Sequence, residues 1–418
     1  MPISVSCRYV GRALSLIRRN ADFRRLFIAQ LVVFGGDWFV IIPLLALLAK
    51  LTGGGVWGGV VLAVDTGILA LLLPYAGTLA DRLDRKKILV TANTVSVVAS
   101  LALLLVRSSA AAPVAVAGIV AIATAKALYS PASQAALPNL VDPEDLAVAN
   151  AIAGSAWGTM LVVGASLGGL IASLVGAYPS FVIGAACLAL AATLTMRVHR
   201  PFQLARGDDP PVKAVAALRE ALRYIGSRPR VMALVTVKSA VGFGNGVLAA
   251  FPILATAVFG MGPFGMGLLY GARGFGALIG PLLLRGVLAH PRRLLTSLAI
   301  SMATYGVCYL LVGFTPWFGL VLVLVVIAHV AGGGNWVLSN FALQTEVPDS
   351  LRGRVFAADM MIAMVAVSLS QAAAGALTDQ FGPQLVISVC GTVTLTYAVL
   401  WRLATLRLLR QTAEQPAG

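Results

Sequence analysis

Long apolar segments separated by short polar connections repeat along almost the whole chain. The first half holds them at about 26–49, 56–80, 88–106, 113–134, 150–176 and 178–196, and the second half at about 230–258, 264–288, 293–313, 317–341, 355–378 and 383–406. Each is long enough to cross about 30 Å of hydrocarbon as an α-helix. The pattern predicts an all-α polytopic membrane protein with twelve transmembrane helices.

Polar stretches divide this pattern into parts. Residues 197–229 contain a helix-breaking Asp-Asp-Pro-Pro sequence and then an amphipathic stretch over 214–225, which is typical of a linker. The predicted division is a cytoplasmic amphipathic segment over 1–22, a six-helix bundle over 23–196, a cytoplasmic linker over 197–229, a second six-helix bundle over 230–406 and a cytoplasmic tail over 407–418.

The amino-terminal segment is rich in arginine, with apolar residues near helical spacing. We expect an amphipathic helix that lies on anionic lipid. A signal peptide is the competing interpretation, but no small-residue cleavage site follows, and the next apolar segment is long enough to span. We therefore keep the segment as part of the mature chain.

Composition agrees with a membrane protein. The 418 residues are 59% hydrophobic and only 11% charged, and the mean hydropathy is +0.91. The net charge of +15 would suggest a nucleic-acid partner in a soluble chain. Here the cations lie in alternate loops, so membrane orientation explains them better and no nucleic-acid partner is expected. The four cysteines are scattered singly, which indicates neither a disulfide framework nor a zinc site.

The distribution of lysine and arginine predicts the topology. With the amino terminus inside, the outer connections hold only Lys50 and Arg107, both at helix ends, and the inner segments hold nearly all the others. By the positive-inside rule, both termini are cytoplasmic.

An internal repeat supports two halves. The sequence QAALP over 134–138 ends the fourth span, and QTEVP over 344–348 ends the tenth, 210 residues later. Gly169 and Gly176 in the fifth span correspond to Gly375 and Gly382 in the eleventh, 206 residues later.

A cluster of charge lies between the second and third spans, in the sequence GTLADRLDRKK over 77–87. Its four cations mark a cytoplasmic turn. That rule does not explain Gly77 and Asp81, which lie four residues apart on one helical face, where glycine permits close approach of another helix and a carboxylate can meet a partner. We interpret the stretch as a membrane hairpin turn that also works as a gate; orientation alone is the alternative.

The spacing resembles the signature loop of the major facilitator superfamily, G-x-L-a-D-R-x-G-R-[RK], between transmembrane helices 2 and 3. Five residues match it in place: Gly77, Asp81, Arg82, Arg85 and Lys86. Asp84 replaces the usual glycine, and we expect it to make the tight turn with left-handed dihedral angles, which aspartate tolerates. The resemblance covers residues 23–406 and implies two six-helix bundles around a central cavity.

The resemblance also implies a partner for the gate. In the superfamily, the aspartate of this loop sits against the amino-terminal end of the eleventh helix and the basic loop before it, which here would be residues 350–354. Asp81 would then meet the positive end of that helix dipole and either Arg352 or Arg354. The contact would form only when the cytoplasmic side is closed.

A closer resemblance is to the bacterial efflux branch of the superfamily, the macrolide-efflux and siderophore-exporter type. It rests on PASQAALP over 131–138, DLAVANA over 145–151 and VPDSLRGRV over 347–355. In the fifth span, GASLGG over 164–169 resembles the antiporter motif G-P-x-x-G-G, with Ala165 in place of the helix-kinking proline. The alternative is that Gly164, Gly168 and Gly169 serve close helix packing.

Ionisable residues inside the predicted spans are the main functional candidates. A lipid-facing charge at mid-bilayer costs about 3 kcal/mol or more, so each should face water or a partner. The resemblance implies that spans 1, 4, 7 and 10 line the cavity, and these carry one such residue each: Asp37, Lys126, Lys238 and His329.

Asp65 and Arg273, in spans 2 and 8, occupy nearly equivalent places in the two halves, 208 residues apart. The alternative to a transport role for all six residues is a set of fixed ion pairs that hold helices together. For His329 it is an interior histidine with its hydrogen bonds satisfied.

Together these features predict a secondary active transporter that exports a small molecule, such as a drug, an antibiotic or a siderophore-like metabolite, across the bacterial cytoplasmic membrane. Proton antiport with alternating access would drive it, because a carboxylate on a cavity helix can bind a proton at one face and release it at the other. Lys126 and Lys238 would favour an anionic or zwitterionic substrate.

We expect a monomer in the lipid bilayer, with the proton as coupling ion and without cofactor or metal. The sequence contains no Walker-type loop, metal cluster or catalytic triad pattern, so neither ATP-driven transport nor an enzyme is expected. The alternatives are an importer or lysolipid flippase of the same fold, and a non-transporting membrane receptor or scaffold.

Overall fold

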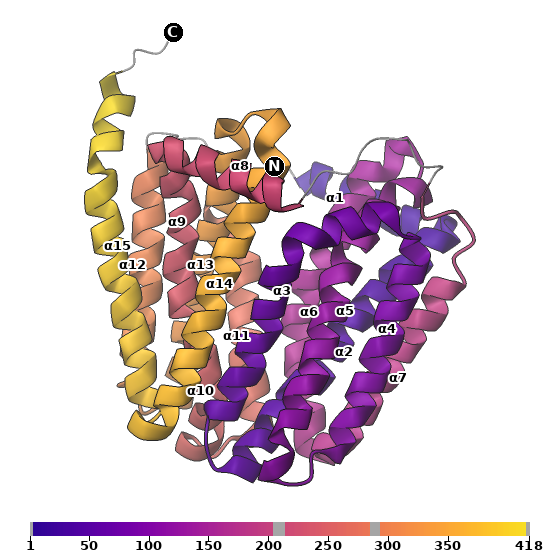
Figure 1. Ribbon diagram of the computed structural model, residues 1–418, viewed down its shortest axis with the longest axis horizontal. Helices are drawn as coiled ribbons and strands as arrows, with labels where there is room; N and C mark the ends of the chain where they lie inside the picture. Colours follow the sequence, from indigo (N-terminus) through magenta and orange to yellow (C-terminus); the bar gives the residue numbers. More distant parts are fainter. Residues whose placement is uncertain (1–2, 204–213, 285–292, 415–418) are drawn as a thin grey trace.

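The computed structural model describes residues 3–203, 214–284 and 293–414, except for the side chains of residues 3–10, 77, 78, 81 and 407–414. Within this described part the chain forms helices and their connections, without a strand (Figure 1). Twelve helices are long and apolar enough to cross a membrane. The predicted fold class, twelve membrane-spanning helices in two six-helix bundles, is confirmed.

The first bundle consists of α2 (Ala21–Thr52), α3 (Val56–Arg82), α4 (Arg85–Ala102), α5 (Ala112–Leu140), α6 (Leu146–Val175) and α7 (Ala177–Met196). The second consists of α9 (Pro229–Gly244), α11 (Gly262–Leu283), α12 (Leu294–Val312), α13 (Phe318–Glu346), α14 (Asp349–Phe381) and α15 (Pro383–Glu414). Two amphipathic helices, α1 (Ile3–Arg19) and α8 (Ala214–Ser227), lie across the helix ends (Figure 1). The domain boundaries themselves stay a prediction.

The helix termini follow local chemistry. Asn20 caps α2, because its side chain accepts a hydrogen bond from the backbone N–H of Phe23 at 2.9 Å. At the other end Gly53 takes a left-handed conformation with φ of 73°, and its N–H donates to the carbonyl of Ala49. The helix therefore ends where a glycine allows the chain to turn back into α3.

The predicted seventh span is not one continuous helix. It is α9, a turn at Asn245 and Gly246, α10 (Val247–Ile253) and the π-helical turn η4 (Leu254–Val258). Asn245 donates its side-chain N–H to the carbonyl of Val241 at 2.7 Å. The backbone N–H of Asn245 donates to the same carbonyl at 2.9 Å, so backbone and side chain of Asn245 together close the last turn of α9.

The bundle has two ends, which we name by what lies there. The terminal face carries α1, α8 and the last residues of α15, and the opposite face carries the connections after α2, α4, η4 and α12 (Figure 1). The exterior between the faces is apolar, with side chains such as Leu71, Leu174 and Leu369 more than 60% exposed. Such a surface suits lipid.

The two bundles meet along two seams, α3 against α14 and α6 against α11. Glycines let the backbones touch: a Cβ added to Gly59 would lie 2.6 Å from the Cα of Gly375, and one added to Gly169 would lie 2.6 Å from the Cα of Gly267. Close approach of this kind is possible only without side chains.

Hydrogen bonds reinforce the first seam towards the opposite face. Thr66 donates to the side chain of Gln371 at 3.1 Å, and Ser368 donates to the carbonyl of Ala63 at 2.7 Å. Asp379 on α14 accepts from the N–H groups of Gly55 and Val56, at the positive end of α3. These four hydrogen bonds hold the bundles together towards the opposite face.

If the glycines hold the two bundles together, a larger side chain on a seam should separate them. Valine at Gly169 must displace α11, whereas valine at Gly154, on the same helix, meets nothing because no atom lies within 4 Å of an added Cβ. Overpacking costs about 1–3 kcal/mol, and separation of the bundles at the opposite face relieves it. We expect Gly169→Val, but not Gly154→Val, to speed alkylation of a buried reporter, Gln371→Cys, in a protein without other cysteines. Equal rates in the two variants would contradict this account.

Candidate functional site

Three of the predicted intramembrane charges lie together in the first bundle. Lys126 on α5 reaches two carboxylates, Asp65 on α3 with Nζ–Oδ1 of 3.2 Å and Asp37 on α2 with Nζ–Oδ2 of 3.4 Å. The side chains of Asp37, Asp65 and Lys126 are 14%, 25% and 32% exposed. The structure thus places one cation between two acids, with all three side chains partly exposed. We call these three residues the acidic triad.

The acidic triad has chemistry that a simple ion pair lacks. With both carboxylates ionised its net charge is −1, so one bound proton makes it neutral. The hydroxyl of Tyr129, one helical turn after Lys126, is buried without a hydrogen-bond partner among the described residues and feels the charge of Asp37. A group of this kind can take up one proton without leaving an unpaired charge in the membrane.

The second bundle holds a different arrangement around Lys238. Its ammonium forms an ion pair with Asp359 on α14 and donates to the side chain of Asn340 at 2.6 Å. The Trp336 ring centroid lies 5.3 Å from the ammonium nitrogen. The side chains of Lys238 and Asp359 are 0% and 1% exposed. This pair is sealed inside the bundle, which favours the structural interpretation of Lys238.

His329 is buried and bonds to the hydroxyl of Tyr309 at 2.8 Å, within an aromatic cluster that includes Tyr305. This placement agrees with a satisfied interior histidine. Arg273 on α11 is half-buried, acts electrostatically on this cluster, and has no hydrogen-bond or ion-pair partner among the described residues. The structure therefore does not pair Arg273 with Asp65.

Aromatic contact links this cluster to the first bundle. The rings of Trp38 on α2 and Tyr270 on α11 lie 5.5 Å apart, and Tyr270 also contacts Phe251 at 5.5 Å. Trp38 follows Asp37 directly, so the acidic triad and the aromatic cluster are neighbours across the interface between the bundles.

Two cations of the predicted gate loop, Arg85 and Lys86, bond to carbonyls of their own bundle. Arg85 donates to the carbonyls of Ala135 at 2.8 Å and Ala80 at 3.2 Å, and Lys86 donates to the carbonyl of Val198 at 2.8 Å. These are carbonyls near helix ends, which cations stabilise. Arg82 is exposed.

The prediction for Asp84 is wrong. Its φ is −63°, and its side chain accepts a hydrogen bond from the N–H of Lys87 at 3.1 Å as the N-cap of α4. No described residue other than glycine has a positive φ. Aspartate suits this place because it caps a helix, so the turn needs no left-handed residue.

The other half of the predicted gate is helical. Residues 350–354 belong to the first turns of α14 and do not form a loop. Arg352 pairs with Asp349 on the same helix, and Arg354 pairs with Glu220 on α8. Gly77 and Asp81 both belong to α3, as expected, and the Asp81 side chain lies outside the described part.

The antiporter-like glycines pack against neighbouring helices. A Cβ on Gly164 or Gly168 would lie 2.7 Å or 2.6 Å from atoms of Trp38 on α2, and Gly169 lies on the seam with α11. Ala165 is fully buried. This geometry favours close helix packing as the role of the three glycines.

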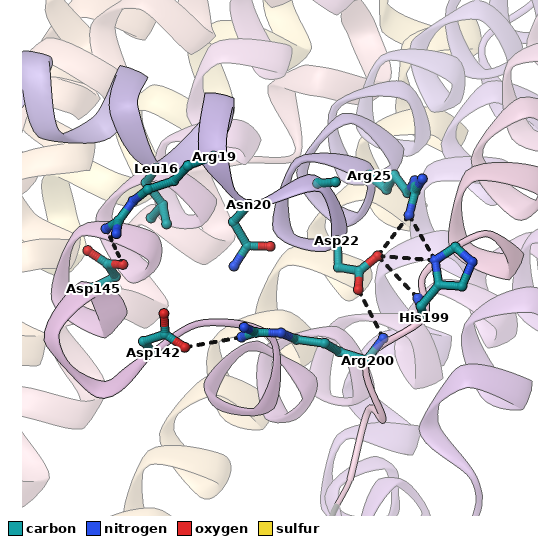
Figure 2. Close-up of a pocket in the computed structure, with 10 residues that line it drawn as sticks. Leu16, Arg19, Asn20, Asp22, Arg25, Asp142, Asp145, His199 and Arg200 are labelled. Atoms are coloured by element: carbon teal, nitrogen blue, oxygen red, sulfur yellow. Dashed lines mark hydrogen bonds and ion pairs between the residues drawn. The ribbon is translucent and has the colours of Figure 1, made fainter.

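A pocket of about 410 Å³ lies at the terminal face, where α1, α2, the α5–α6 connection and the end of α7 meet (Figure 2). Its charges are already paired: Arg19 with Asp145, Arg25 with Asp22, and Arg200 with Asp142 (Figure 2). Asp22 also accepts from the backbone N–H groups of His199 and Arg200, at 3.1 and 3.0 Å. The network ties α1 and the segment after α7 to α2, and it leaves no spare charge for a ligand.

Two partners of the candidate residues were not predicted from the sequence: Asp359, which pairs with Lys238, and Tyr309, which bonds to His329. Asp359 lies inside the apolar segment 355–378. The criterion that selected Lys238, a charge within a span, also selects Asp359. Nothing in the sequence distinguishes Tyr309 from other tyrosines in the spans.

The model of the Major Facilitator Superfamily matches residues 26–358 and 243–417. The multidrug efflux pump Tap of Mycolicibacterium fortuitum is 26% identical over 379 residues, which cover 85% of this chain and 89% of Tap. The enterobactin exporter EntS of Salmonella choleraesuis is 26% identical over 416 residues, 96% of each chain.

A solved structure also shows the fold. A bacterial homolog to the human lysosomal transporter Spinster has a TM-score of 0.74 at 15% identity, over 96% of this chain and 100% of that one.

The contrast between the two charge clusters gives a stability prediction. Removing one partner of a buried ion pair leaves an uncompensated charge and costs about 3–5 kcal/mol. We therefore expect Lys238→Met to lower the melting temperature of the purified protein strongly, and the additional change Asp359→Leu to restore most of it.

Lys126→Met is the matched control, because the acidic triad is partly exposed and the two carboxylates left behind can share a proton. Its melting temperature should stay close to that of the unmodified protein. A Lys238→Met, Asp359→Leu protein as unstable as the single variant would contradict the structural interpretation of this pair.

Proposed function

Because this chain belongs to the major facilitator superfamily, whose members carry small molecules across membranes, we propose that it is a proton-coupled exporter with alternating access. Transport itself follows from the family. The direction, the substrate class and the coupling ion are the proposal, and the acidic triad is the observation that carries it.

The proposed orientation places the terminal face in the cytoplasm. The arginines of α1 and the gate-loop cations lie at that face, whereas the described connections of the opposite face carry only Lys50 and Arg107. The bundles are held together at the opposite face, so this conformation would be inward-facing. The acidic triad would then be hydrated from the cytoplasm.

Coupling would use the one-proton capacity of the triad. When the cavity faces outward, a proton binds to Asp37, and Lys126 keeps Asp65 as its partner. When the cavity faces the cytoplasm, Asp37 releases its proton to water. The ionised carboxylate then pairs with Lys126 again, at 3.4 Å. The protonated triad is neutral, and the ionised triad, with net charge −1, would be hydrated from the cytoplasm, as a charge in a membrane requires.

Export is supported by the relatives, one described as a multidrug efflux pump and one as an enterobactin exporter. Lys126 and Lys238 both have carboxylate partners, so they supply less attraction for an anion than the sequence suggested. Arg273, beside Tyr270 and Tyr305, is the cation that remains for a polar or anionic group of the substrate.

Asp37→Asn tests the coupling. A panel of antibiotics, siderophores and lysolipids, screened by accumulation in a strain without its own pumps, supplies a substrate. In proteoliposomes, we expect Asp37→Asn to lose transport driven by an imposed pH gradient while it still exchanges substrate across the membrane, because the amide keeps the shape but cannot carry the proton. Full gradient-driven transport by this variant would show that Asp37 does not couple proton movement to transport.

Asp84→Asn is the control for this charge change. Asparagine caps a helix as well as aspartate does, and Asp84 lies outside the triad. Its gradient-driven transport should equal that of the unmodified protein.

The gate stays a proposal, in which Asp81 meets the start of α14 when the cytoplasmic side closes. The helix dipole contributes about 0.3–1 kcal/mol, and a contact with Arg352 or Arg354 adds to it. Asp81→Asn should raise the inward-facing population several-fold and slow alkylation of Gln371→Cys at the opposite face. Asp84→Asn again serves as control. An unchanged rate in Asp81→Asn, with transport reduced, would show that the residue does not lock the gate.

A further inference from the structure

A cavity at the opposite face plays no part in the mechanism above. Its volume is about 700 Å³, and both bundles form its walls. The first bundle contributes the last turns of α2, the end of α6 and the start of α7, and the second contributes the end of the π-helical turn and the start of α11. A ligand here would contact both moving parts of the protein.

Two prolines stand at corresponding places in the helices that line the cavity. Pro43 lies inside α2, and Pro252 precedes the π-helical turn, 209 residues later, which matches the internal repeat. Proline removes a backbone donor, and a π-helical turn widens the helix. Thr256 in that turn donates to the carbonyl of Pro252 at 2.6 Å. The π-helical turn therefore forms part of the cavity wall.

The walls of the cavity are apolar, and its one charged residue is a cation. Pro43, Leu47, Ile253 and Pro263 contribute apolar surface, and Lys50 is the charged lining residue. Lys50 is exposed, and no described residue bonds to it. Its ammonium is free to bind an anionic group.

A second cation stands beside the same cavity. The guanidinium carbon of Arg107 lies 3.9 Å from the ring centroid of Tyr178, which lines the cavity and donates its hydroxyl to the carbonyl of Val106. Lys50 and Arg107 are the two cations of the predicted outer connections, and both are found here. Asp379, the acid of this face among the described residues, is occupied by the amides of α3.

We propose that this cavity binds an amphiphilic organic anion, with its apolar chain against Pro43, Leu47 and Ile253 and its carboxylate or sulfonate at Lys50. Burial of the chain and a charge-assisted contact supply the affinity, and Arg107 adds positive potential. A cavity of this size suits a small ligand. The inference concerns binding and stands whether the protein exports or imports.

Protection of a thiol tests the proposal. The protein, without other cysteines and with Thr256→Cys as reporter, is placed in phosphatidylcholine nanodiscs and alkylated with a hydrophilic maleimide. Octane-1-sulfonate should slow alkylation saturably, and octyltrimethylammonium, with the same chain and the opposite charge, should not. Lys50→Gln should weaken protection about tenfold, as loss of one charge-assisted contact predicts, whereas Lys50→Arg should retain it.

A reporter outside the cavity separates binding from general effects. Phe314→Cys, at the same face and 75% exposed in its native form, should be alkylated at one rate with or without the sulfonate. Equal slowing at both positions, equal protection by the cation, or full protection in Lys50→Gln would overturn the proposal. Nanodiscs with phosphatidylglycerol identify the source of the anion: protection without added sulfonate indicates a lipid, and its absence indicates a soluble amphiphile.

Discussion

A charge inside hydrocarbon needs either a partner or water, and the two bundles meet this requirement in different ways. In the second bundle, Lys238 and Asp359 satisfy each other in a sealed interior, with Asn340 as a further acceptor. In the first, Lys126 is shared between Asp37 and Asp65, and all three remain partly exposed. The sealed pair can hold helices together, whereas only the hydrated group can exchange a proton. The two repeats therefore differ in their buried charges: the first has a partly exposed triad, and the second has a sealed ion pair.

Small residues determine where the bundles touch. At Gly59 and Gly375, and again at Gly169 and Gly267, the helix backbones are so close that a methyl group would not fit. Within a membrane, such contacts supply the packing that the hydrophobic effect supplies in water. They also explain Gly164 and Gly168, which allow Trp38 to lie against α6. Trp38 is thereby held beside Tyr270, next to the acidic triad.

The sequence predicts the spans well because length and hydrophobicity decide them, and the amphipathic linker helix over 214–225 falls within α8. It fails where an interaction crosses between helices. Hydropathy shows that Lys238 is inside a span but not that α14 brings Asp359 to it. The replacement of glycine by Asp84 suggested a strained turn, whereas the structure has a helix cap. Residues 350–354 are polar enough to suggest a loop, yet they are helical, and Arg352 and Asp349 pair along one face of this helix.

The distribution of charge contacts also bears on how the two conformations can interconvert. At the terminal face, Arg85 and Lys86 donate to carbonyls of their own bundle, and Arg354 pairs with Glu220 on α8. When the bundles separate at this face, each of these cations keeps the partner named here. At the opposite face, Asp379 bridges the bundles, but its partners are amides at the protein surface, which water can replace when the seam opens. The sealed pair of Lys238 and Asp359 lies within one bundle and can stay intact in both conformations. Glycine packing, a few hydrogen bonds and the protonation of the acidic triad then set the balance between the conformations, and small differential contacts can shift it.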